Sequence, residues 1–87
     1  MSHSERSPDD YISFLNQRIG AEIAERRTAL GLSAYTLAKA AAVSDQTVLN
    51  IERGHYANGC WTATLARMAL RFGTTLSELV TAAERRA

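Results

Sequence analysis

Apolar side chains recur along this chain with the spacing of α-helices. The first such stretch contains Tyr11, Leu15, Ile19, Ile23 and Leu30. Their period predicts a helix over residues 8–30. Ser7 can cap this helix, and Pro8 suits its first position. Gly20 lies inside the stretch, so two shorter helices joined at Gly20 are the alternative.

Four shorter helices are expected to follow. They span residues 34–41, residues 45–53, residues 61–72, and a last segment that begins at Thr75 or Ser77. Ser33 and Ser44 precede the first two as caps, and Gly54 closes the second. The positions expected to face the core are Leu37, Ala38, Ala41, Val48, Ile51, Leu65, Met68, Ala69, Phe72, Leu76, Leu79 and Val80. No stretch shows the alternation typical of strands, so the sequence predicts an all-α fold.

Composition narrows the class of protein. The chain has 87 residues, of which 46% are hydrophobic, so a single small globular domain is expected. Its only cysteine is Cys60, which fits a reducing compartment, and no stretch resembles a signal peptide or a membrane span. We therefore expect a cytoplasmic protein. The net charge is +1, so any nucleic-acid contact must come from a local patch.

Residues 32–54 carry the most informative pattern. Two short capped helices are joined by about three residues, and the first has a small residue, Ala38, where the second must approach closely. Val43 is an apolar residue in the connection, and Val48 and Ile51 give the second helix its inward face. This pattern predicts a helix-turn-helix unit, whose second helix has an outer face free to enter a DNA major groove.

The same pieces, taken in order, resemble the Xre family of lambda-repressor and Cro-like proteins. The matching pieces are Ile19-Gly20, Arg27, Leu30-Gly31-Leu32-Ser33, Leu37-Ala38, Val43-Ser44, Val48, Ile51-Glu52-Arg53-Gly54, Leu65, Ala69 and residues 72–79. The resemblance implies a compact five-helix lambda-repressor-like DNA-binding domain with an extended first helix. Its parts would be an N-terminal arm and helical extension (1–18), the helix-turn-helix domain (19–80) and a tail (81–87). The sequence departs from the family at Ala34, Thr36 and Ala42, where glutamine, glutamate and glycine are usual.

Four residues at the start of the third helix are candidates for reading bases. Gln46 and Asn50 share its outer face, and a side-chain amide can form two hydrogen bonds with adenine. Thr47 could touch a thymine methyl group or a phosphate, or could pack in part against the core. Asp45 could accept a hydrogen bond from cytosine or act only as a partner of the helix dipole. Leu49 lies beside them and is expected to be exposed.

Other polar residues are candidates for the phosphate backbone, because hydroxyl groups and helix N-termini bind phosphate. These candidates are Ser33, Ser44, Arg53, His55, Tyr56 and Asn58. The resemblance also implies a salt bridge between Arg27 and Glu52, which in this family ties the first helix to the end of the third. No His or Cys set has metal-ligand spacing, and no nucleophile stands with a base, so neither cofactor, metal nor enzymatic activity is expected.

These features predict a sequence-specific transcriptional regulator, a repressor that binds double-stranded operator DNA as a homodimer. The alternatives are a protein-interaction module on the same fold and the antitoxin of a toxin–antitoxin pair, whose partner would be a toxin. Residues 8–18 hold Tyr11, Ile12, Phe14 and Leu15, which is much apolar surface for an extension. That surface is expected either to meet a second subunit or to pack on the last two helices. Trp61 is expected to pack in the core, and a contact with a second subunit is the alternative for it.

Overall fold

The computed structural model describes residues 7–55 and 62–86, and all regular structure in that part of the chain is α-helical. The helices are α1 (Pro8–Ala29), α2 (Ala34–Ala41), α3 (Asp45–Glu52), α4 (Thr62–Arg71) and α5 (Leu76–Glu84). The expected all-α, five-helix fold with a long first helix is confirmed. The predicted boundaries of the first four helices agree with the observed ones to within one residue. No end was predicted for the last helix, and α5 ends at Glu84.

Hydroxyl caps explain where four of these helices begin. Ser7, Ser33, Ser44 and Thr75 all have extended backbone, and each side chain accepts a hydrogen bond from the backbone N–H three residues later. These bonds measure 3.0–3.2 Å. Each cap satisfies a backbone donor that the helix itself leaves unpaired, which stabilises the helix by roughly 1 kcal/mol. Of the two expected starts for the last helix, Thr75 is the observed cap and Ser77 is not.

Helix α1 runs through Gly20 without a break, so the alternative of two shorter helices is wrong. Gly20 is buried where the end of α3 crosses α1. A Cβ atom at residue 20 would overlap the carbonyl oxygens of Ile51 and Glu52. The glycine therefore allows the two helix backbones to touch, and it does not interrupt the helix.

The core lies between α1 and the four short helices. Its buried apolar members are Ile19, Ile23, Leu37, Ala38, Ala41, Val48, Ile51, Leu65, Met68, Ala69, Leu79 and Ala83. Phe72, Leu76 and Val80 were expected in the core and are only partly buried against it. Two members of the apolar period expected for the first helix, Tyr11 and Leu30, are instead 41% and 52% exposed.

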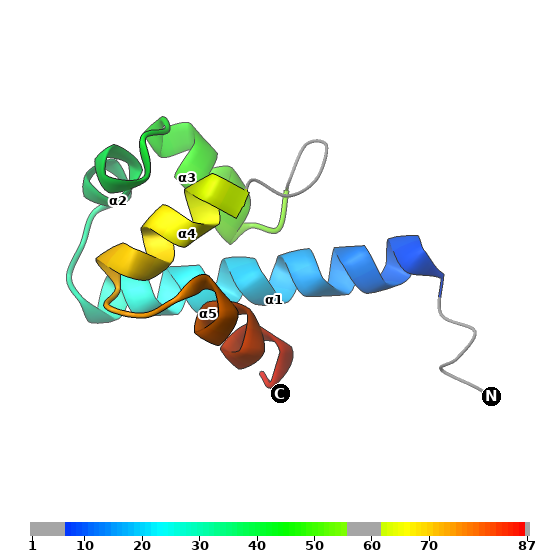
Figure 1. Ribbon diagram of the computed structural model, residues 1–87. Coiled ribbons are helices and arrows are strands. Elements are labelled where there is room, and N and C mark those ends of the chain that lie inside the picture. The colour runs from blue at the N-terminus through cyan, green and yellow to red at the C-terminus, as the bar shows by residue number, and fades with distance from the viewer. Residues whose placement is uncertain (1–6, 56–61, 87) are drawn as a thin grey trace.

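Figure 1 shows α1 as a long base, with α2, α3 and α4 on one side of it and α5 on the other. Helix α1 contacts α3 and α5, and α2 contacts α3 and α4. The N-terminal end of α1 projects beyond the other helices. None of the described helices combines the length and the apolar character needed to cross a membrane.

Candidate nucleic-acid interface

Helices α2 and α3 are joined by a tight turn over residues 42–44. Ala42 adopts a left-handed conformation (φ 62°, ψ 42°), and the Val43 N–H bonds to the Ala38 carbonyl oxygen at 3.0 Å. An alanine in this conformation costs roughly 1–2 kcal/mol relative to a right-handed one, which a glycine would avoid. The turn is nevertheless kept, because α2 and α3 bury Leu37 and Val48 completely against the core. The result is a helix-turn-helix arrangement.

The outward face of α3 carries two amide side chains that are bonded to each other. Val48 and Ile51 point inward and are fully buried, which turns Gln46 and Asn50 to the other side of the helix. The Gln46 Nε2 group donates a hydrogen bond to Asn50 Oδ1 at 3.0 Å. Gln46 is exposed and Asn50 is half-buried. Leu49, expected to be exposed, is half-buried as well.

Hydroxyl pairs sit at the N-termini of both helices. Ser44 Oγ and Thr47 Oγ1 are 3.0 Å apart, and Ser33 Oγ and Thr36 Oγ1 are also 3.0 Å apart. Thr47 is thus held against the cap of α3 and half-buried, while Asp45 in the same turn is exposed. The second pair gives Thr36 a role beside the cap of α2 that was not predicted. Its signal was the repeated spacing Ser-x-x-Thr at residues 33–36 and 44–47.

The structure brings Arg27 and Glu52 together. Arg27 Nε donates to Glu52 Oε2 at 2.6 Å, and Arg27 Nη2 donates to Glu52 Oε1 at 3.1 Å. Arg27 Nη1 also donates to the Leu32 carbonyl oxygen at 2.9 Å. The hydrogen bonds with Glu52 raise the pKa of Arg27 above its ordinary value, against the opposing effect of burial. One guanidinium therefore links α1, the α1–α2 connection and the C-terminal end of α3.

The candidate phosphate-binding residues lie at two places. Ser33 and Ser44 are exposed at the N-termini of α2 and α3, where helix dipoles favour anions. Arg53 and His55 are exposed just after α3. Four residues singled out from the sequence lie outside the described residues, namely Tyr56, Asn58, Cys60 and Trp61.

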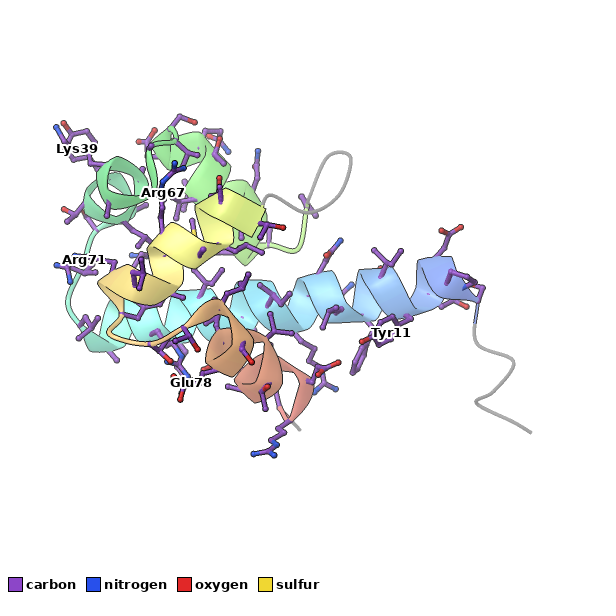
Figure 2. All side chains as sticks on the ribbon, viewed as in Figure 1. Tyr11, Lys39, Arg67, Arg71 and Glu78 are labelled. Atoms are coloured by element: carbon purple, nitrogen blue, oxygen red, sulfur yellow. The ribbon has the colours of Figure 1, made fainter. Side chains whose placement is uncertain are left out.

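Three further cations gather on α2 and α4. Lys39, Arg67 and Arg71 are exposed, and neither helix contains an acidic residue. Within the described part of the chain none of the three takes part in an ion pair. Figure 2 shows all three at the end of the molecule opposite to Tyr11. None of the three was predicted as a site residue, although residues 34–41 and 62–71 contain no Asp or Glu and therefore indicate a basic surface.

The described residues also include no cluster of three or more His, Cys, Asp or Glu side chains placed to hold a metal ion. A cluster of ionic groups lies instead between α1 and the segment that follows α5. Arg86, just after α5, donates to Glu22 and Glu25 of α1 at 2.7 Å in each case. Arg26 donates to Glu22 at 2.6 Å. This network attaches the C-terminal segment to α1.

Comparisons with known proteins give structural likenesses, while sequence comparisons give none. No protein-family model matches the chain, and no curated protein matches it. Two solved structures of the clp gene regulator ClgR from Corynebacterium glutamicum are similar, with TM-scores of 0.73 and 0.72. Each is 24% identical over 80% of this chain, and the match covers 72% of one ClgR chain and 87% of the other. This chain therefore has the same fold as ClgR.

Proposed function

We propose that this protein is a sequence-specific DNA-binding transcriptional regulator of the Xre type that acts as a repressor. The observation that carries the proposal is the outward face of α3, where Gln46 and Asn50 stand opposite the buried Val48 and Ile51. Amide groups on an exposed helix are suited to base edges in the major groove. The likeness to a protein described as a gene regulator supports this reading of the fold.

In this proposal α3 enters the major groove and Gln46 and Asn50 contact bases. In the first turn, Asp45 accepts a hydrogen bond from a cytosine, and Thr47 contacts a thymine methyl group or a phosphate. The phosphate contacts come from Ser33, Ser44, Arg53 and His55, together with Tyr56 and Asn58 from the sequence analysis. The cations of α2 and α4 add positive potential, which attracts DNA and makes binding depend on salt. The Arg27–Glu52 ion pair holds the C-terminal end of α3 against α1 and so fixes the position of the helix that contacts bases.

Two protomers are proposed to act together on half-sites about 34–36 Å apart, one turn of the DNA helix. The surface proposed for pairing is the projecting part of α1 within residues 8–18. Tyr11 and Ile12 are 41% and 49% exposed there, and the Tyr11 hydroxyl donates to Glu84 at 2.8 Å. A second copy would cover apolar surface that this protomer leaves in water, and each fully buried side chain stabilises the contact by roughly 1.5–3 kcal/mol.

A second candidate function is a protein-interaction module, such as the antitoxin of a toxin–antitoxin pair. It is favoured by the exposed Asp45 at the start of α3, since a carboxylate there repels phosphate, and by the net charge of only +1. In either case we propose a cytoplasmic protein without catalytic activity.

The deciding experiment is selection of bound sequences from random double-stranded DNA, followed by a salt titration of the selected site. We expect a two-fold symmetric site whose affinity falls steeply with salt, because bound phosphates release counterions. Failure to enrich any sequence, with no salt-dependent binding, would favour the interaction module.

A further inference from the structure

Tyr35 lies on the side of α2 that faces away from the core. Leu37 and Ala38 are buried, whereas Tyr35, the second residue of the helix, is 61% exposed, so its ring adds little to the packing. Among the described residues its hydroxyl group has one hydrogen-bond partner, Lys39, which lies one turn further along α2. These two side chains form a polar pair on the outer face of the helix.

The chemistry of the pair determines which group donates. Lys39 Nζ and the Tyr35 hydroxyl oxygen are 3.5 Å apart, which is a long and weak hydrogen bond. An ammonium group has donors only, so the phenol oxygen accepts and its own hydrogen remains free to donate. Lys39 takes part in no ion pair within the described part of the chain. The pair therefore presents two adjacent donors and one positive charge, which suit an anion.

Both groups are directed towards the N-terminal end of α2. Side chains of a helix lean towards its N-terminus, and residues four apart lie above one another on one face. Lys39 accordingly reaches back to the hydroxyl group of Tyr35, and Figure 2 shows it extending from α2 away from the other helices. Ser33, a proposed phosphate contact, is exposed at that same end of α2. The pair therefore extends the proposed phosphate-binding surface from Ser33 along α2.

We propose that Tyr35 and Lys39 together bind one phosphate group of the DNA backbone, with the phenol O–H and the ammonium each donating to a phosphate oxygen. A backbone phosphate has two exposed oxygens, so two donors 3.5 Å apart can each contact one of them. Phosphate groups are the same in every sequence, so this contact positions α2 on the duplex and selects no bases. The inference rests on the proposed DNA-binding function and adds Tyr35, which was not among the candidates predicted from the sequence.

The test is a fluorescence anisotropy titration of the full chain with two duplexes of equal length, one carrying the selected site and one of random sequence. Tyr35→Phe removes only the phenol oxygen, so it should weaken binding to both duplexes by the same factor, about 2- to 13-fold. Tyrosine is neutral, so the slope of log affinity against log salt should stay as in wild type. Lys39→Ala should reduce that slope by about 0.9, because one cation no longer neutralises a phosphate.

A double-mutant cycle tests whether the two side chains share one phosphate. In the Lys39→Ala background, Tyr35→Phe should weaken binding by a smaller factor than in wild type, because groups that share a ligand are coupled. Thr81→Val is the matched control, since it removes an exposed hydroxyl group from α5, on the other side of α1. This variant should bind both duplexes like wild type. Thermal melting by circular dichroism establishes that each variant keeps the fold.

Three outcomes would overturn the inference and leave the proposed function in place. Wild-type affinity of Tyr35→Phe would show that the phenol contacts no phosphate. A loss of affinity confined to the selected site would show that Tyr35 contacts a base. Independent effects of the two substitutions would assign Tyr35 and Lys39 to separate phosphates. If wild type binds neither duplex, the proposed function fails and the inference fails with it.

Discussion

Gly20 of α1 lies directly against the carbonyl oxygen of Ile51 in α3, at a separation too small for any Cβ atom at position 20. This contact sets how closely α3 approaches α1. Because the neighbouring atoms belong to the backbone, a change of side-chain rotamer cannot move them away.

We therefore expect Gly20→Ala to lower the free energy of unfolding by about 1–3 kcal/mol, the usual cost of overpacking. At an ordinary helix position the same change raises the free energy of unfolding by about 0.5–1 kcal/mol. The sign of the change therefore distinguishes a close backbone contact from an ordinary helix position. Urea denaturation measures it. An increase in stability would show that α1 and α3 are not in backbone contact at residue 20.

The Arg27–Glu52 ion pair should couple α1 to α3 energetically. The side chains are 17% and 9% exposed, so screening by water is only partial, and we expect a coupling energy of about 0.5–3 kcal/mol. A double-mutant cycle with Arg27→Ala and Glu52→Ala measures it by thermal unfolding. The pair Arg86–Glu25, whose glutamate is 67% exposed, is the control and should couple by less than about 1 kcal/mol. Additive effects at Arg27 and Glu52 would contradict the prediction.

Charge on the projecting part of α1 should prevent pairing of two protomers. Ile12 is 49% exposed, so Ile12→Glu should leave the fold intact and shift the protein towards monomer. Leu70→Glu is the matched control, because Leu70 is 70% exposed on α4, away from the proposed contact. Sedimentation velocity across a dilution series compares both with wild type. If the Ile12→Glu protein is as dimeric as wild type, the dimer contact does not lie on the projecting part of α1.

Removal of the cations on α2 and α4 should change the salt dependence of DNA binding. Each phosphate contact that is lost should reduce the slope of log affinity against log salt by about 0.9. We expect this decrease for Lys39→Ala, Arg67→Ala or Arg71→Ala if the side chain contacts DNA. Arg85→Ala is the control, since Arg85 follows α5 on the other side of α1. If all four variants keep the wild-type slope of log affinity against log salt, the DNA contact lies away from α2 and α4.

Acid should weaken the attachment of the C-terminal segment to α1. Burial acts to raise the pKa of Glu22, but hydrogen bonds from Arg26 and Arg86 outweigh it and lower the pKa below its ordinary 4.5. A lowered folded-state pKa means that this stabilisation is present above the unfolded pKa and is lost as pH falls through the folded one. Thermal melts from neutral pH to below pH 4.5 should show a smaller acid-induced loss in Glu22→Gln than in wild type. An identical acid dependence would contradict this account.

The sequence by itself determined the helices and the turn between α2 and α3. Helix period and hydroxyl caps act over three or four residues, so Ser33 and Ser44 predict the starts of α2 and α3 without knowledge of the rest of the chain. The outward direction of Gln46 was also predictable, because it follows from the buried positions of the same helix.

Only the tertiary structure decided which of these faces are covered and, apart from the Arg27–Glu52 pair that the family resemblance implied, which side chains meet. The apolar period of α1 includes Tyr11, but this residue stays 41% exposed and its hydroxyl donates a hydrogen bond to Glu84 of α5. The close contact at Gly20 depends on the path of α3, which lies about thirty residues further along the chain. Likewise, Lys39 and Arg67 are far apart in sequence and share one end of the molecule because α2 packs against α4. Contacts of this kind depend on how helices are arranged in space, and local pattern carries no information about that arrangement.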